Sequence, residues 1–159
     1  MKNIKSCLEL GTFTGYSSLS MALSLPKNGK IHTIDNDISK NKIAKSFFVK
    51  AKVEKKIKTE ISDGIIAIDK LIKKRKKFDL IFIDADKENY IKYFDKSLKL
   101  LNKNGLIIID NILWKGEVIN DLAKDKLTIK IKNFNDHIKK TKINKYILPI
   151  GDGFFICWK

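Results

Sequence analysis

The fold is decided by the stretch from Cys7 to Ser18, Cys-Leu-Glu-Leu-Gly-Thr-Phe-Thr-Gly-Tyr-Ser-Ser. It opens with an apolar run that predicts a buried strand, and the run breaks at Gly11. From Tyr16 onward, apolar residues recur at helical spacing, at Leu19, Ala22 and Leu23. A strand that turns through glycines into a helix presents free backbone N–H groups and the positive end of the helix dipole. The stretch therefore predicts a ligand-binding loop, with an ordinary strand-to-helix turn as the alternative.

Three residues of this loop suit a ligand directly. Gly11 and Gly15 would admit a ligand where a Cβ would obstruct it. Glu9, at the end of the strand, can accept hydrogen bonds from a ligand amine or hydroxyl.

The rest of the chain alternates strand and helix patterns. A helix is expected from 16 to 25, and a second one capped by Ser39, with an apolar face at Ile43, Ala44, Phe47, Phe48 and Ala51. The fourth expected helix, with an apolar stripe at Tyr90, Phe94, Leu98 and Leu101, should end at Asn104-Gly105. The strand expected at 78–84 is apolar enough to be buried on both faces of the sheet. Strands are expected at 7–10, 30–35, 57–62, 78–84, 106–110, 146–150 and 154–158.

Five strand-then-helix units and a terminal hairpin predict an α/β fold. It is a doubly wound, mostly parallel sheet with helices on both faces and an antiparallel hairpin around Gly151-Asp152-Gly153. No linker or internal repeat interrupts the pattern, so residues 1–159 are expected to form a single domain.

The composition of the chain bears on its possible partners and on its cellular compartment. The net charge of +15 suggests a polyanion partner such as a nucleic acid, but Arg75 is the only arginine and lysine is spread along the whole chain. An A/T-rich genome would produce the same bias with no partner. Cys7 and Cys157 lie in apolar runs and are expected to be buried thiols, which fits a cytoplasmic protein. No apolar run is long enough for a bilayer, so no membrane partner is expected.

A polar residue stands at the end of each of the first five predicted strands. In a doubly wound sheet the ligand crevice lies outside the carboxyl ends of the strands, so these side chains should meet at one edge. They are Glu9, Asp35, Asp63, Asp84, and Asp110 with Asn111.

Asp35 follows the glycine turn at the distance at which an acid holds the ribose hydroxyls of an adenosine cofactor. The dinucleotide fingerprint is absent, because Phe13 and Ser18 replace two of its glycines and leave no pyrophosphate cradle. Adenosine without pyrophosphate suggests S-adenosylmethionine. Ser17 would then receive the methionine carboxylate at the helix N-terminus, and Asp63 would contact the adenine amine.

Asp84, Asp110 and Asn111 form an all-oxygen set, which suits Mg²⁺, Ca²⁺ or Mn²⁺ rather than zinc. Such a cation would bind two neighbouring hydroxyls of a small acceptor and make one of them more acidic. Lys87 follows Asp84 closely enough to help remove the proton. The alternative makes both aspartates helix caps and Lys87 a surface residue.

Four segments together resemble the cation-dependent O-methyltransferases of the caffeoyl-CoA and catechol type, over essentially the whole chain. They are LELGTFTGYSS, FIDADKENY, IDNILW and LPIGDG. The resemblance implies the seven-stranded, Rossmann-like class I methyltransferase sheet with a reversed last strand, S-adenosylmethionine as donor, and a homodimer.

The same resemblance carries roles to positions of this chain. The metal ligands would be Asp84, Asp110 and Asn111, and the general base Lys87. The donor-binding positions would be Glu9, Gly11, Thr12, Ser17, Asp35 and Gly64.

Two hypotheses of different kinds follow. The first is a metal-dependent O-methyltransferase that acts on a small catechol-like or caffeoyl-type acceptor, with a variant that methylates a hydroxylated uridine in tRNA. The second is a truncated, inactive domain that binds the donor or a protein partner. It is motivated by the helices that members of this family carry before the first strand, whereas here Met1 almost adjoins that strand.

Overall fold

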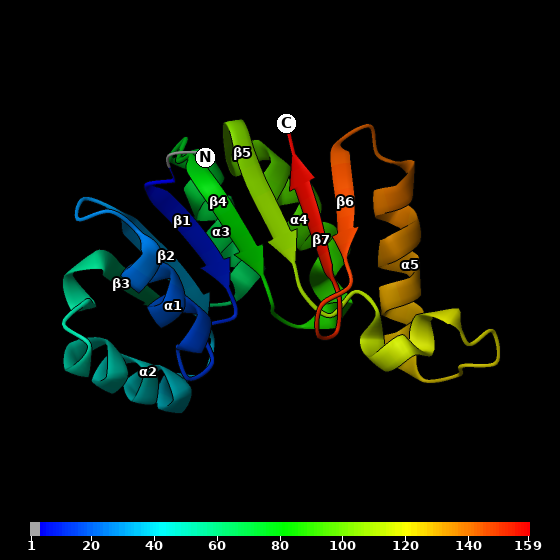
Figure 1. The fold of residues 1–159 in the computed structure, drawn as a ribbon, viewed down its shortest axis with the longest axis horizontal. Coiled ribbons are helices and arrows are strands. Elements are labelled where there is room, and N and C mark those ends of the chain that lie inside the picture. Colours follow the sequence, from blue (N-terminus) through cyan, green and yellow to red (C-terminus); the bar gives the residue numbers. More distant parts are fainter. Residues whose placement is uncertain (1–3) are drawn as a thin grey trace.

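The computed structural model describes residues 4–159, so expectations tied to Met1 lie outside the described residues. One seven-stranded sheet runs in the order β3-β2-β1-β4-β5-β7-β6 (Figure 1). The strands are β1 Ser6–Leu10, β2 Lys30–Asp35, β3 Ile57–Ile61, β4 Phe78–Ile83, β5 Leu101–Ile109, β6 Asn144–Leu148 and β7 Phe154–Trp158. The α-helices are α1 Tyr16–Ser24, α2 Ile38–Lys50, α3 Gly64–Lys73, α4 Tyr90–Leu100 and α5 Lys126–Lys140. Short 3-10 turns are η1 Glu54–Lys56, η2 Lys87–Asn89 and η3 Trp114–Ile119.

The predicted fold class is confirmed. Strands β1 to β5 pair in parallel, while β7 runs antiparallel to both β5 and β6. The register is level at the carboxyl ends, because Leu10 pairs with Ile34 and Ile83, and Ile83 pairs with Ile109. The residues that follow these four strands therefore emerge along one edge of the sheet.

The two faces of the sheet bury separate clusters of apolar side chains. Leu8 and Leu10 of β1 belong to the larger cluster, which they share with helices α3, α4 and α5. Cys7, on the opposite face of β1, belongs to a smaller cluster formed with α1 and α2. This alternation is the period-two pattern of a strand covered on both sides. Figure 1 shows α1 in front of the sheet and α3 and α4 behind it.

Helices cover only part of the sheet on the face that carries α1. The expectation that β4 is buried on both faces is therefore wrong. Ile81 and Ile83 are fully buried against α3 and α4, whereas Leu80 and Phe82 are only half-buried. Among residues 4–159 no helix lies over β4, β5 and β7 on this side (Figure 1). An apolar sequence shows that both faces can be buried, but it does not show what covers each.

Two local predictions also need correction. Asp37, and not Ser39, caps α2, because its Oδ1 accepts a 2.9 Å hydrogen bond from the Lys40 amide. Asn104-Gly105 does not end a helix. It lies inside β5, which begins directly after α4, and it accompanies a register shift against β4 that a left-handed Asn104 accommodates.

The predicted apolar face of α2 is half right. Ala44 and Phe48 are buried, but Ile43 and Phe47 point outward, with Phe47 46% exposed. Both cysteines are buried and unpaired, as predicted. No helix among the described residues has the length and apolar character that crossing a membrane requires.

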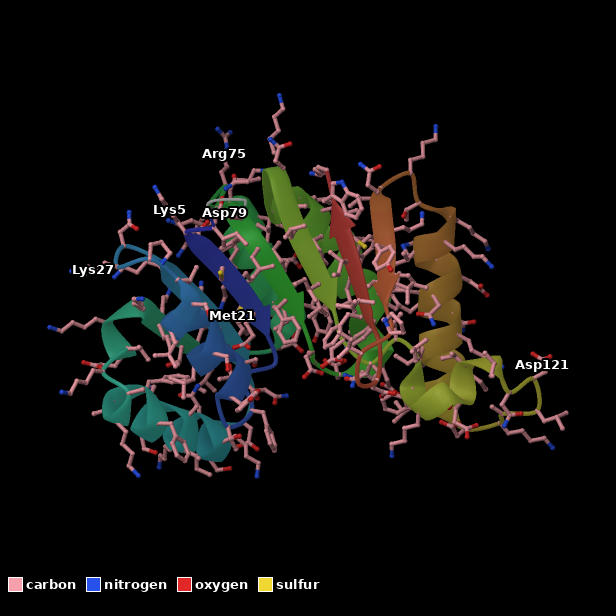
Figure 2. All side chains as sticks on the ribbon, viewed as in Figure 1. Lys5, Met21, Lys27, Arg75, Asp79 and Asp121 are labelled. Atoms are coloured by element: carbon pink, nitrogen blue, oxygen red, sulfur yellow. The ribbon has the colours of Figure 1, made fainter. Side chains whose placement is uncertain are left out.

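Asp79 of β4 ties together the amino ends of three adjacent strands. Its Oδ2 accepts hydrogen bonds from the amides of Lys5 and Ser6, both 2.9 Å long, and its Oδ1 accepts one from Asn102 at 2.7 Å. Partial burial opposes ionisation, but these hydrogen bonds outweigh it and lower the pKa of Asp79. Lys5 and Asp79 lie side by side in Figure 2, far from the loop that carries Asp121.

We expect Asp79→Asn to lower the free energy of unfolding by about 1–3 kcal/mol near neutral pH, because it removes a charged acceptor from several hydrogen bonds. A lowered folded-state pKa contributes stability above the unfolded value of about 4, and that contribution is lost as the pH falls through the lowered value. The deficit should therefore shrink in acid. Urea unfolding of both proteins at neutral pH and again at acidic pH measures this loss of stability. The control is Asp121→Asn, which changes a fully exposed side chain. A pH-independent deficit would contradict this account.

Candidate functional site

The site is built where the ends of β1 and β4 meet. The Asp84 amide donates to the Leu10 carbonyl at 2.9 Å, and Gly11 follows with φ +96°. A Cβ on Gly11 would lie 1.9 Å from the Asp84 carbonyl oxygen, so only glycine fits between these two loops. The loop after β1 and the loop after β4 are therefore held in direct backbone contact.

The expectation that Gly11 and Gly15 make room for a ligand needs correction, because the space beside Gly11 is taken by the Asp84 carbonyl. A Cβ on Gly15 would meet Ala44 and Phe48 of α2, and one on Gly64 would meet the ring of Tyr93. Both glycines therefore admit other parts of the chain, and Gly15 is buried. Gly64 still borders the cleft described below, whereas Gly15 does not.

Glu9 differs from its predicted role as well. It is fully buried beneath the loop, and its carboxylate accepts hydrogen bonds from the hydroxyls of Ser17, Ser18 and Thr33. Burial raises the pKa of Glu9, although these hydroxyls oppose the shift. With no exposed atom, Glu9 positions Ser17 instead of reaching a ligand itself.

Asp35 organises the loop between β1 and α1. Its Oδ2 accepts hydrogen bonds from the amides of Thr12 at 2.9 Å and Phe13 at 2.8 Å, and its Oδ1 accepts one from Asp37 at 2.9 Å. These bonds hold Phe13 in a left-handed conformation with φ 47°. Thr12 is buried, and its hydroxyl meets that of Thr33 at 2.5 Å. Contact of Asp35 with a ribose stays a prediction.

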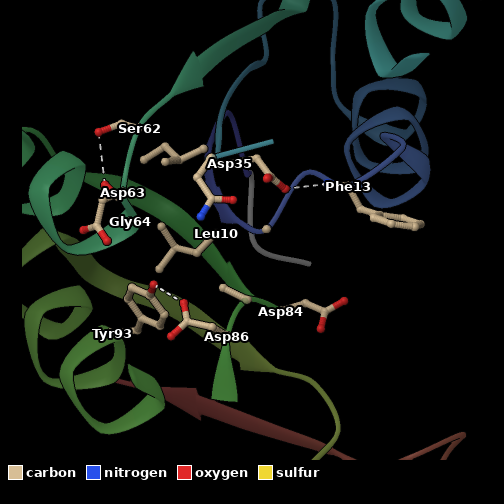
Figure 3. Close-up of a pocket in the computed structure, with 13 residues that line it drawn as sticks. Leu10, Phe13, Asp35, Ser62, Asp63, Gly64, Asp84, Asp86 and Tyr93 are labelled. Atoms are coloured by element: carbon tan, nitrogen blue, oxygen red, sulfur yellow. Dashed lines mark hydrogen bonds between the residues drawn. The ribbon is translucent and has the colours of Figure 1, made fainter. Parts of the chain in front are cut away.

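A polar cleft of about 270 Å³ lies along this edge of the sheet (Figure 3). It brings together four of the predicted site residues, Gly11, Asp35, Asp63 and Gly64, with Asp84 at its border. Asp63 also caps α3 by accepting from the Ile66 amide at 3.0 Å.

Two residues of this cleft, Asp86 and Tyr93, were not predicted from the sequence. The Tyr93 hydroxyl donates to Asp86 at 2.5 Å, and Figure 3 shows the pair beside Gly64 with the Asp84 carboxylate directed away from them. Burial and Asp86 raise the pKa of Tyr93, so it stays a neutral donor. The polar residues of Asp84-Ala85-Asp86-Lys87 could have been recognised as a group, but the partner of Asp86 lies on the next helix.

A second, apolar hollow of about 580 Å³ lies on the α1 face of the sheet. Thr12 and Ser17 border it on one side, and Asp84 and Asp110 border it at the sheet edge. Its floor is the half-covered sheet, formed by Leu80, Phe82, Ile108, Phe154 and Ile156. Asp84 and Gly11 line both hollows, so the two open on either side of the same loop.

Lys87 brings the predicted oxygen ligands together. Its ammonium lies 2.9 Å from Asp84 Oδ1, 2.7 Å from Asn111 Oδ1 and 2.6 Å from the Tyr90 hydroxyl. Its side chain is only 13% exposed. Asn111 adopts a left-handed backbone with φ 59°, and its amide donates to Asp110 at 2.6 Å. Two of the three predicted ligands therefore face one cationic nitrogen, and neither aspartate caps a helix.

Negative charge accumulates around this point. Burial raises the pKa of Asp110, and the charges of Asp84 and Asp152 add to the rise, whereas the Asn111 amide and Lys87 oppose it. Burial and the same carboxylates also raise the pKa of Tyr90, which therefore stays protonated.

The three predicted metal ligands have the chemistry that a hard cation prefers. Within residues 4–159 no three histidine, cysteine or acidic side chains gather for a metal ion. The predicted ligands are two carboxylates and the amide oxygen of Asn111. Because only two of the three are acidic, they do not form a group of that kind. Because Asp84 and Asn111 already converge on a cation, the residues fit a divalent ion that prefers oxygen.

The sheet, with β7 reversed between β5 and β6 and a cleft at the ends of β1, β2 and β4, defines a class I methyltransferase. The family model described as O-methyltransferase matches residues 1–159, so the chain belongs to this family.

Individual proteins with O-methyltransferase names are similar to the chain over nearly its whole length. The chain is 34% identical to mouse catechol O-methyltransferase domain-containing protein 1, over 98% of this chain and 60% of that protein. It is 35% identical to the caffeoyl-CoA O-methyltransferase of Stellaria longipes, over 96% of this chain and 67% of the relative. The chain thus spans less than two thirds of the mouse relative's length.

Solved structures show the same architecture. An O-methyltransferase from Bacillus cereus in complex with SAH superposes with a TM-score of 0.90 at 29% identity, over 98% of this chain and 74% of that one. TomG from Streptomyces achromogenes, in complex with SAM, superposes with a TM-score of 0.84 at 25% identity, over 98% of this chain and 73% of that one.

We expect Gly11→Ala to destabilise the fold by at least about 2 kcal/mol more than Gly116→Ala. Both glycines have positive φ, but a Cβ on Gly116 has no atom within 4 Å, so the difference isolates the collision with Asp84. Thermal or urea unfolding of the two variants measures it. Equal losses would show that the two loops can move apart.

Proposed function

We propose that this chain is an S-adenosylmethionine-dependent O-methyltransferase that requires a divalent cation and acts on a small catechol-like or caffeoyl-type acceptor. The observation that carries the proposal is the position of Asp84. It borders the polar cleft on one side and contacts Lys87 beside Asn111 on the other. One residue would thus set the distance between methyl donor and acceptor, which is the geometric requirement of a transfer reaction.

The polar cleft supports the donor half of the proposal. Asp35 lies at the end of β2, where an acid reaches ribose hydroxyls, and Asp63 lies across the cleft for the adenine amine. Ser17, which borders the neighbouring apolar hollow, is on the first turn of α1, where the helix dipole favours the methionine carboxylate. Bound SAM and SAH in two structural relatives supports the same ligand here.

The oxygen cluster supports the acceptor half. Asp84, Asp110 and Asn111 would hold the cation, which when bound supplies a Lewis acid that orients the acceptor hydroxyl and makes it more acidic. After losing its own proton, which the positive charge of the bound cation would favour, Lys87 Nζ would take the hydroxyl proton. The apolar hollow beside Asp110 would exclude water from the donor methyl.

Asp110→Ala should abolish cation-dependent methylation while leaving donor binding within about threefold of wild type. The measurement is methyl transfer from S-adenosylmethionine to catechol and caffeoyl-CoA with Mg²⁺ or with chelator, next to calorimetry of the donor. Asp136→Ala removes an exposed acid on α5 as the matched control.

Turnover that persists in chelator would disprove the cation's role. Donor binding without methylation of any acceptor would favour a donor-binding domain over an enzyme.

A hydroxylated uridine in tRNA is the second candidate acceptor, and helix α2 favours it. This helix carries four lysines, Lys40, Lys42, Lys45 and Lys50, and no acidic residue. The Lys40 ammonium lies over the ring of the exposed Phe13, and the Lys50 ammonium over that of Phe47. Lysines for phosphates and exposed aromatic rings for bases are the features of a surface for single-stranded RNA. Lysine side chains also project from other parts of the molecular surface, Lys27 among them (Figure 2).

If α2 binds RNA, replacing Lys42 and Lys45 by glutamate should flatten the salt dependence of tRNA binding by about one unit for each phosphate that the helix no longer neutralises. Fluorescence anisotropy over a salt series measures the slope. The matched control replaces Lys139 and Lys140, exposed at the end of α5. Identical slopes for the two double variants would leave only nonspecific attraction.

A further inference from the structure

The Lys87 ammonium occupies the point at which two of the three predicted cation ligands, Asp84 and Asn111, converge. Three acceptors surround it at 2.6 to 2.9 Å, namely Asp84 Oδ1, Asn111 Oδ1 and the Tyr90 hydroxyl. An ammonium has three N–H donors, so all of them are used. The Tyr90 ring centroid lies 4.8 Å away and adds a cation–π contact. The hydrogen-bonding capacity of the ammonium is therefore satisfied by the protein itself.

We propose that Lys87 is a built-in competitor for the divalent cation, so that the ion enters only by displacing the ammonium from Asp84 and Asn111. The proposal rests on the proposed function, because it takes those two side chains as cation ligands. A positive ion and an ammonium repel each other and need the same oxygen lone pairs, so both cannot be bound there at once.

The surroundings explain why the chain keeps an ammonium here. The negative charges of Asp84 and Asp152 act on Asp110, and without a cation they would repel its carboxylate. Lys87 neutralises part of that charge. It also joins the loop after β4 to the loop after β5 through the Asp84 and Asn111 contacts. The site can therefore remain folded before the cation arrives.

Tyr90 gives the displaced amine a second anchor. Its hydroxyl is fixed by a 3.3 Å hydrogen bond to the Asp110 carbonyl and its ring packs edge-on against Phe134, with 5.2 Å between centroids. Tyr90 is fully buried, so it stays in place when Lys87 moves. Cation binding would thus move the Lys87 ammonium away from Asp84 and Asn111 while the hydrogen bond to Tyr90 keeps it within the site. Arrival of the cation and release of the amine would thus be one event.

Direct cation binding tests the proposal without any turnover. We expect Lys87→Met, which keeps the length of the side chain, to bind Mn²⁺ about tenfold more tightly than wild type in an electron paramagnetic resonance titration at one fixed pH. Lys115→Met removes an exposed charge from the nearby η3 turn and should change the affinity much less. An equal gain in both variants would indicate general electrostatics and overturn the proposal.

Stability gives a second, independent test. Without metal, Lys87→Met should melt at a lower temperature than wild type, because Asp84 and Asp110 lose their counter-charge, and Mn²⁺ should restore more stability to the variant than to wild type. In protein labelled with ¹⁵N-lysine, the ammonium signal that disappears in Lys87→Met should shift when Mg²⁺ is added. A signal that does not respond to saturating Mg²⁺ would overturn the proposal.

The two proposals fail in different ways. If wild type binds Mn²⁺ but Lys87→Met binds it no more tightly, the competition is wrong and the cation-dependent function stands. If neither protein binds Mn²⁺ and methylation proceeds in chelator, the cation role itself is wrong, and the competition is wrong with it.

Discussion

The close backbone contact between Gly11 and Asp84 is the constraint on which the rest of the site depends. It joins the ends of two adjacent parallel strands so tightly that no side chain fits between them. On one side of this contact, Asp35 and the buried Glu9 network shape the loop that begins α1. On the other side, Asp84 turns its carboxylate toward Lys87. The two halves of the proposed site are thereby fixed by one simple feature, the absence of a Cβ on Gly11.

Polar side chains divide into two kinds along this edge. Glu9 is buried and Asp35 spends most of its hydrogen-bonding capacity on loop amides, so both act first on the chain itself. Asp63 and Asp84 keep contact with solvent and border the cleft. A ligand would therefore meet a surface whose shape is already set, which reduces the ordering that binding must impose.

The sheet and its polar edge could be predicted from sequence because they follow from local signals. The Asp and Asn residues come directly after apolar strands, and parallel strands end at the same edge. What could not be predicted depends on contacts between distant segments. Gly15 meets Phe48, Asp86 meets Tyr93, and Glu9 is enclosed by Ser17, Ser18 and Thr33. Likewise, the sequence placed Lys87 beside Asp84 but did not reveal that Asn111 and Tyr90 surround the same nitrogen.

The unequal clusters on the two faces of the sheet have a consequence for local unfolding. Helices α1 and α2 share the smaller set of buried side chains, so within the described chain their transient opening should need less free energy than that of α3 to α5. The glycine loop leads into α1 and packs on α2 through Gly15, so it belongs to this weaker unit. A molecule that binds only the closed loop would shift the opening equilibrium of the entire unit by mass action. A ligand in the polar cleft would then reduce the local opening of both α1 and α2.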